Sequence, residues 1–268
     1  MTNWQASGVI TITTDFGHKG PFAAVMTGVI VKRFPQARVI DLAHDIPAHW
    51  PPEAGFWLSR SYSYFPTGTV HVAIVDPGVG TEREILLAMK DGHVFMAPDN
   101  GLLGPILEDA DSIYKLAQDA PGRIGAGIPS LTFHGRDIFA PIAAEIAAGR
   151  IGIADVGDET SQWTPGWLED PESSNGRVAG VVVTVDAFGN LISNIDASLI
   201  DRFERPVVHI GGHDINMKPT YGRVNPGEYL ALINSFGVVE IARSEDSAAT
   251  GLGCERGAPV VVIDKAVG

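Results

Sequence analysis

The chain has 268 residues, of which 45% are apolar, with 31 glycines, 18 prolines and a formal net charge of -13 at pH 7. This length predicts one large domain or two modest ones, and the acidic total argues against a nucleic-acid partner because no basic stripe is available to meet phosphates. We expect a cytoplasmic protein without an internal disulfide, since the amino terminus lacks a signal-like pattern, no apolar run reaches membrane-spanning length, and Cys254 is the single cysteine.

Short apolar strands alternate with helical patterns in the first half of the chain. Pro21 stands at a favoured first position of a helix, and the apolar residues after it recur at helical spacing. In chain order, the expected strands and helices cover residues 9–13, 21–34, 39–42, 53–64, 69–75 and 138–148. This alternation predicts an α/β amino-terminal domain with a mostly parallel sheet, over residues 1–160.

The second half of the chain reads differently. From about Gly152 the composition shifts to acidic, serine, proline and glycine residues without a clear period, and we expect residues 161–176 to be a linker. Short strands separated by turn residues follow at 178–185, 207–210, 229–233, 238–242 and 259–263. They predict a smaller all-β, barrel-like or sandwich domain over residues 177–268.

Asp76 directly follows the strand at 69–75 and precedes the turn Pro77-Gly78-Val79-Gly80. Open α/β sheets bind ligands at the carboxyl ends of their strands, and the two glycines allow a close approach of the backbone. Asp-Pro-Gly is also a common turn, so the residues by themselves leave a functional and a structural interpretation of Asp76 open. Likewise, Arg83 alone fits a surface ion pair, and His134 alone fits a hydrogen-bonded core histidine.

Six short motifs occur along the chain: Thr13-Thr14-Asp15-Phe16-Gly17, Val75-Asp76-Pro77-Gly78-Val79-Gly80-Thr81-x-Arg83, Ala97-Pro98-Asp99-Asn100-Gly101-Leu102, Phe133-His134-Gly135-Arg136-Asp137, Asp186-x-Phe188-Gly189-Asn190 and Asn234-Ser235-Phe236-Gly237. In this order they resemble the S-adenosylmethionine hydroxide adenosyltransferases, the adenosine-forming hydrolases related to fluorinase and chlorinase. The resemblance extends from about residue 9 to residue 263. It implies an α/β domain, a β-barrel-like domain, and a homotrimer whose active sites lie between one subunit's first domain and its neighbour's second.

The resemblance also implies an activity, the hydrolysis of S-adenosyl-L-methionine to adenosine and L-methionine. The substrate's 5′-carbon can be displaced in line because methionine leaves as a neutral thioether, so the enzyme must supply an aligned, partly deprotonated water. By resemblance, the catalytic set that activates this water is Asp76, Arg83 and His134. The implied substrate-binding residues are Asp15 for the ribose, Trp50 at the substrate wall, Phe188 and Asn190 for the adenine, and Asp186 and Ser235 for the methionine end. A core or hinge role for Trp50, and a plain hairpin turn at 186–190, stay open.

Two positions distinguish this chain from relatives. The halogenases carry a tyrosine in place of Asp76 and a halide-holding serine in place of Gly135, so the resemblance favours water as the nucleophile here. Many relatives have a second aspartate five residues after the ribose-binding one, where this chain has Gly20. That change leaves Asp186 to hold the substrate's ammonium group alone, and makes another 5′-substituted adenosine a possible preference.

His44 and His49 look like the start of a metal site, but Pro47 prevents a helix from placing both rings on one face and no third ligand follows at a familiar spacing. We therefore expect no metal and no cofactor. The alternatives to a hydrolase are a halide-using adenosyltransferase, a non-catalytic adenosyl-ligand binding protein, and a metal-dependent hydrolase that uses the histidine pair.

Overall fold

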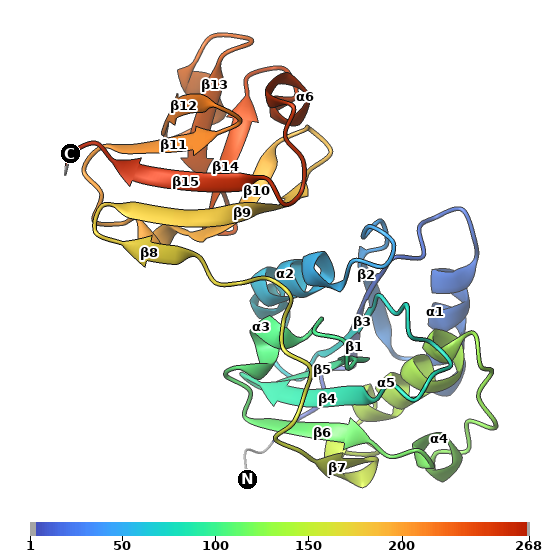
Figure 1. Ribbon diagram of the computed structural model, residues 1–268. Helices are drawn as coiled ribbons and strands as arrows, with labels where there is room; N and C mark the ends of the chain where they lie inside the picture. Colours follow the sequence, from blue (N-terminus) through green and yellow to red (C-terminus); the bar gives the residue numbers. More distant parts are fainter. Residues whose placement is uncertain (1–3, 267–268) are drawn as a thin grey trace. The chain divides into compact units, whose positions relative to one another are not determined.

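The computed structural model describes residues 4–266 (Figure 1). The chain divides into two compact units, Met1–Trp167 and Leu168–Gly268. The backbone N–H of Thr164 and the indole N–H of Trp167 donate to Asp99 and Asn100, so the first part of the segment expected as a linker lies on the amino-terminal unit. None of the helices formed by the described residues combines the length and apolar character that a membrane span requires.

The amino-terminal unit is built on a seven-stranded sheet of order β2-β1-β3-β5-β4-β6-β7. Its strands are β1 (Val9–Thr14), β2 (Arg38–Ala43), β3 (Val70–Ile74), β4 (Ile85–Lys90), β5 (His93–Pro98), β6 (Ser112–Leu116) and β7 (Gly157–Glu159). The pairs β1–β2, β1–β3 and β3–β5 are parallel, whereas β4, β6 and β7 pair antiparallel. The expectation of a mostly parallel sheet is therefore confirmed for one half of this mixed sheet and wrong for the other.

A two-residue turn explains why β4 and β5 pair antiparallel. Between β4 and β5, Asp91 and Gly92 both have positive φ, of 51° and 76°. Tight hairpin turns that match the twist of the flanking strands require such angles, and Asp-Gly adopts them readily. The Asp91-Gly92 pair between two apolar runs is thus a hairpin signal in the sequence that the strand–helix interpretation overlooked.

Helices cover both faces of this sheet, and they are α1 (Phe22–Arg33), α2 (Pro51–Ser61), α3 (Gly104–Leu107), α4 (Ala120–Arg123) and α5 (Ala140–Ala147). The α1 connection leads from β1 out to β2, and the α2 connection leads from β2 back past β1 to β3. Because crossovers of one hand that run in opposite directions lie on opposite faces, α1 with α5 and α2 with α3 form two separate layers. Alternate residues along β3 and just after it fill the two cores, with Val72 and Ile74 on the α1 side and Ala73 and Val75 on the α2 side.

The same topology places the carboxyl ends of β1 and β3 side by side, with the chain leaving the two strands in opposite directions. This is the switch point at which open α/β sheets bind ligands. Asp15 follows β1 and Asp76 comes just after β3.

The carboxyl-terminal unit is an antiparallel sheet of order β12-β11-β15-β9-β10-β14-β13, with β8 added to β9. Its strands are β8 (Glu172–Ser174), β9 (Arg177–Val185), β10 (Leu191–Asp196), β11 (Pro206–Ile210), β12 (His213–Asn216), β13 (Tyr229–Ile233), β14 (Val238–Arg243) and β15 (Pro259–Asp264), and α6 (Ala248–Leu252) is its helix. A bridge between Met217 and Ala231 joins the end of β12 to β13, so the sheet nearly closes. The expected barrel-like β domain is confirmed, and the chain has the expected two-domain architecture.

Candidate active site

Asp76, Arg83 and His134 come together at the carboxyl end of β3. Arg83 Nε donates to both carboxylate oxygens of Asp76, at 3.0 and 2.9 Å, and Arg83 Nη2 donates to Asp76 Oδ2 at 2.5 Å and to His134 Nδ1 at 2.9 Å. The side chains of Arg83 and Asp76 are 11% and 5% exposed. The ion pair is therefore largely shielded from water, where charge-assisted hydrogen bonds are strong.

The contact with Arg83 determines which nitrogen of His134 carries the proton. A guanidinium has no acceptor atom, so Nδ1 must be the unprotonated nitrogen and Nε2 must bear the hydrogen. Burial and then the Arg83 charge lower the pKa of His134, against opposing contributions from Asp76 and Asp137. His134 is thus neutral at neutral pH and offers a hydrogen-bond donor, whereas Asp76 offers acceptors.

Two glycines hold the segment around His134 against the Asp76 turn. Gly80 has φ +79°, and a Cβ there would lie 2.3 Å from the carbonyl oxygen of Leu131. A Cβ on Gly135 would meet Met26 Sδ at 3.0 Å and Phe133 Cε2 at 3.2 Å. Gly135 also opens a turn of π-helix, Gly135–Phe139, a feature that is frequent at functional sites.

Asn100, just after the end of the neighbouring strand β5, stabilises the backbone next to Asp76. Its Nδ2 donates to the carbonyl oxygen of Val75 at 2.8 Å, and its Oδ1 accepts from the backbone N–H of Leu102 at 3.2 Å. Its own carbonyl accepts from the indole N–H of Trp167 at 2.7 Å. Because Val75 precedes Asp76, Asn100 fixes the backbone that carries the carboxylate, a role that the motif at 97–102 does not reveal by itself.

Asp15 lies at the end of β1 and faces the loop before α2. Its Oδ2 accepts from the backbone N–H of His49 at 3.2 Å. His49 has a φ of +62°. A positive φ is uncommon for a residue other than glycine, and residues with such strained backbone angles cluster at functional sites. Trp50 directly follows His49 and precedes α2, so it adjoins a residue that contacts Asp15.

His44 is buried and links the exposed Asp41 to the buried Thr14. Its Nε2 lies 3.0 Å from Asp41 Oδ1 and its Nδ1 lies 2.8 Å from Thr14 Oγ1. The order acid–histidine–hydroxyl resembles a hydrolase triad. Thr14, however, is fully buried, and its Oγ1 also accepts from the backbone N–H of Phe16, so these contacts support the turn after β1. Within residues 4–266, no group of three or more His, Cys, Asp or Glu side chains is arranged to hold a metal ion.

Gly20 faces an aromatic cluster formed by Phe16, Phe22 and Phe133. The rings of Phe16 and Phe133 lie 6.0 and 5.6 Å from that of Phe22, in edge-to-face contact. A Cβ on Gly20 would lie 2.7 Å from Phe22 Cε2. Phe16 directly follows Asp15 and Phe133 directly precedes His134, so the cluster adjoins two residues of the expected site.

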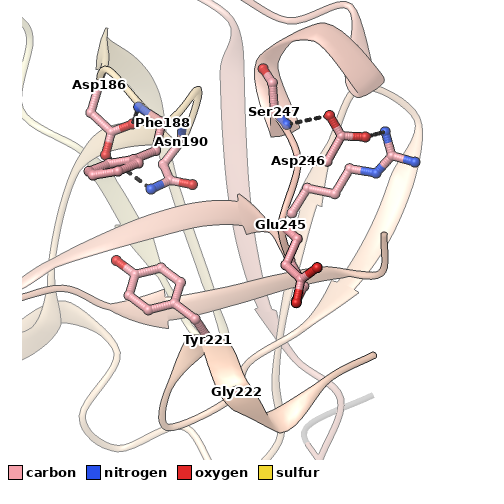
Figure 2. Close-up of a pocket in the computed structure, with 10 residues that line it drawn as sticks. Asp186, Phe188, Asn190, Tyr221, Gly222, Glu245, Asp246 and Ser247 are labelled. Atoms are coloured by element: carbon pink, nitrogen blue, oxygen red, sulfur yellow. Dashed lines mark hydrogen bonds and ion pairs between the residues drawn. The ribbon is translucent and has the colours of Figure 1, made fainter. Parts of the chain in front are cut away.

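The carboxyl-terminal unit contains a pocket of about 730 Å³, within the range usual for small-molecule sites. Figure 2 shows the turn that carries Asp186, Phe188 and Asn190 on one side of it and the segment 245–247 on another. Its lining residues are Asp186, Phe188, Asn190, Tyr221, Gly222, Arg243, Ser244, Glu245, Asp246 and Ser247. Phe188 is 80% exposed and Asn190 is 7% exposed, so one side chain is free to contact a ligand and the other is a fixed part of the wall.

Asp186 organises its own turn. Oδ1 accepts from the backbone N–H groups of Phe188 and Asn190, both at 2.9 Å, and Oδ2 accepts from Asn190 Nδ2 at 3.0 Å. A carboxylate has about four acceptor sites, so about one is left for a ligand. The hairpin interpretation of this motif therefore describes the geometry well, and it does not conflict with a binding role.

Ser235 lies outside the lining of this pocket, in the turn between β13 and β14. Asn234 shapes that turn, because its Oδ1 accepts from the backbone N–H groups of Phe236 and Val238 at 3.0 and 3.3 Å. The structure therefore divides the expected site residues into three groups: the Asp76 set with Asp15 and Trp50 in the first unit, the Asp186 turn in the second, and the Ser235 turn.

Comparisons with known proteins find relatives that match most of the chain. The (R)-S-adenosyl-L-methionine hydrolase of Thermus thermophilus is 35% identical over 92% of this chain and 96% of its own length. A fluorinase of Actinoplanes sp. is more distant, at 23% identity over 88% of this chain and 91% of its own. The crystal structure of an uncharacterized conserved protein from Thermotoga maritima superimposes with a TM-score of 0.88 at 31% identity, covering 95% of this chain and 99% of that one.

Two family profiles match as well. The SAM hydroxide adenosyltransferase N-terminal domain matches residues 10–157, and the C-terminal domain of the same family matches residues 180–261. Between them they include each of the residues assigned to the candidate site. The chain therefore belongs to the SAM hydroxide adenosyltransferase family.

Proposed function

We propose that this protein hydrolyses S-adenosyl-L-methionine at its 5′-carbon, giving adenosine and L-methionine. The observation that carries the proposal is the Asp76–Arg83–His134 arrangement, in which one guanidinium orients a carboxylate acceptor and a neutral imidazole donor. The relatives named (R)-S-adenosyl-L-methionine hydrolase support the same assignment.

In the proposed mechanism a water molecule donates one hydrogen bond to Asp76 and accepts one from the Nε2–H of His134. Its oxygen attacks the 5′-carbon as the carbon–sulfur bond breaks, the bonding electron pair goes to sulfur, and Asp76 accepts the water's proton. Arg83 keeps Asp76 and His134 in place through the reaction. A neutral thioether leaves, so the step requires neither a metal nor another cofactor.

The remaining residues bind the substrate in this proposal. Asp15 accepts from the ribose hydroxyls and Trp50 forms part of the wall, while Phe188 and Asn190 contact the adenine, and Asp186 and Ser235 hold the methionine end. The acidic side chains at the pocket, Asp186 and Glu245 among them, suit a substrate that carries a positive sulfonium.

Water fits this site better than halide. The Asp76 carboxylate would repel an anion in the same position. A serine in place of Gly135 would crowd Met26 and Phe133, whose side-chain atoms would lie 3.0 and 3.2 Å from its Cβ and would have to shift slightly. The halide-using alternative therefore lacks both its donor and a compatible charge.

The reaction is tested by incubating the protein with S-adenosyl-L-methionine in ¹⁸O-water, with and without a chelator. We expect label in the 5′-hydroxyl of adenosine and an unchanged rate with the chelator. Label in methionine, or loss of activity on chelation, contradicts the mechanism. A 5′-halogenated product in chloride or fluoride would establish the halide-using alternative, and tight adenosine binding without turnover would establish a binding protein.

We further propose a homotrimer in which the first unit of one subunit and the second unit of its neighbour complete each site. Each unit holds only part of the expected set, and the family resemblance supports a closed ring of this kind. When Asp76→Ala and Asn190→Ala variants are dissociated, mixed equally and reassembled, about a quarter of the sites should regain an intact pair of units. Activity that never exceeds the sum of the two variants, or an active monomer in light scattering, would rule out shared sites.

A further inference from the structure

Glu240 is a buried carboxylate in a central strand of the carboxyl-terminal unit. It lies on β14, between β10 and β13, in register with Ile192 and Leu232, and is 3% exposed. Burying a carboxylate in an apolar sheet destabilises a fold unless hydrogen bonds compensate it. The mechanism above does not use this residue, so its presence there requires another explanation.

Both oxygens of Glu240 accept hydrogen bonds from side chains on separate loops. The hydroxyl of Tyr221 donates to Oε1 at 2.7 Å, and Nδ2 of Asn234 donates to Oε2 at 3.2 Å. Burial and then the hydrogen bond to Glu240 raise the pKa of Tyr221, so its hydroxyl remains protonated and keeps donating. One carboxylate thus joins the loop before β13 to the turn after it.

The two partners of Glu240 lead to two parts of the proposed substrate site. Tyr221 lines the pocket with Phe188 and Asn190, as Figure 2 shows. Asn234 shapes the turn that carries Ser235, because its Oδ1 accepts hydrogen bonds from two backbone N–H groups of that turn. Glu240 itself does not line the pocket, so any influence on the ligand passes through these neighbours.

We propose that Glu240 is a positioning residue of the substrate site, which orients the Tyr221 ring in the pocket wall and the Ser235 turn together. The assignment rests on the proposed function, because it takes the pocket to receive the adenosyl group and Ser235 to receive the amino-acid end.

The Glu240→Met variant removes both contacts while keeping the length of the side chain, because a thioether sulfur is only a weak acceptor. Glu240→Gln is the conservative variant. Its oxygen can accept from Asn234 while its nitrogen donates to the Tyr221 hydroxyl, which can turn to accept, so this variant should keep both partners.

The experiment measures binding of adenosine and of L-methionine by calorimetry, and hydrolysis of S-adenosyl-L-methionine, in the full chain. For Glu240→Met we expect the Kd of adenosine and the KM to rise about tenfold, the effect of losing the hydrogen bond that orients Tyr221, with kcat within a few-fold, and we expect Glu240→Gln to stay close to the wild type. Tyr221→Phe removes the same contact from the other side, so the double variant should bind adenosine no more weakly than the weaker single variant.

Ser193→Ala is the matched control. Ser193 is fully buried on β10 and donates to the carbonyl of Val239, beside Glu240, at 2.7 Å. Its loss should lower the melting temperature without changing either Kd. If Glu240→Met behaves like this control, Glu240 is only structural and the proposal is overturned.

Other outcomes also decide between the proposals. If Glu240→Met does not fold, Tyr221→Phe alone decides, and unchanged adenosine binding in that variant overturns the proposal. Wild-type protein that binds adenosine but does not hydrolyse S-adenosyl-L-methionine contradicts the proposed function, while the adenosine measurements still decide the role of Glu240. Wild-type protein that binds neither ligand contradicts both.

Discussion

Replacement of Asp76 by alanine is expected to lower the rate of hydrolysis at saturating substrate by about 10²- to 10⁴-fold, the usual contribution of a positioned acid–base group. In the proposed mechanism Asp76 is the group that accepts the water's proton, and its side chain, 5% exposed, has no bulk water to replace it. His134→Ala removes the donor that aligns the same water and should fall in the same range. Single-turnover kinetics together with calorimetric Kd values measure both effects.

Asp99→Asn provides a matched control for Asp76→Ala. Asp99 also follows a strand of the same sheet, β5, but its carboxylate accepts from the backbone N–H of Thr164 and not from Arg83. Its replacement should change the rate only a few-fold. If Asp76→Ala instead abolished ligand binding while turnover per bound ligand stayed normal, Asp76 would be a binding residue and the assigned role would be wrong.

Replacement of Arg83 by methionine is expected to destabilise the amino-terminal unit by about 3–5 kcal/mol. The change leaves the buried carboxylate of Asp76 without the donors that now hold both its oxygens. Urea unfolding of the variant, followed by a probe in the amino-terminal unit, measures the loss.

The double variant Asp76→Asn/Arg83→Met removes both charges together and serves as the control for that loss. It should recover most of the free energy of unfolding, because no uncompensated charge is left, yet it should stay inactive. Equal stability of Arg83→Met and the wild type would show that solvent reaches Asp76. A double variant that is as unstable as Arg83→Met would show that the loss comes from packing of the arginine side chain.

The extent to which the fold could be predicted differs between the two halves of the first sheet. The run that ends at Val75 is a buried strand in both the sequence and the structure, since an apolar run before Asp-Pro-Gly has few alternatives. The β4–β5 hairpin was missed because no strand or helix was assigned between residues 76 and 137, although Asp91-Gly92 marks the turn. β10 was missed because Leu191 to Asp196 mixes apolar and polar residues, and its strand pairing with β9 and β14 compensates for that composition.

The sequence motifs predict which residues belong to the candidate site, but they do not predict the contacts between those residues. Arg83 joins Asp76 to His134 only because the fold brings in a loop that lies 51 residues further along the chain. The tautomer of His134 depends on the same contact. Asn100 reaches the carbonyl of Val75 only because β5 pairs with β3. Such contacts depend on strand pairing and loop closure, and a motif within one segment carries no information about them.

Gly20 has a consequence for attempts to convert this chain into one with a second aspartate at that position. The ring of Phe22 already fills the space in which a side chain on residue 20 would begin. The carboxylate and the three-ring cluster are therefore mutually exclusive, and Gly20→Asp alone would push Phe22 off Phe16 and Phe133. An aspartate introduced at position 20 therefore calls for a smaller residue at position 22 as well, so the two positions have to be changed together.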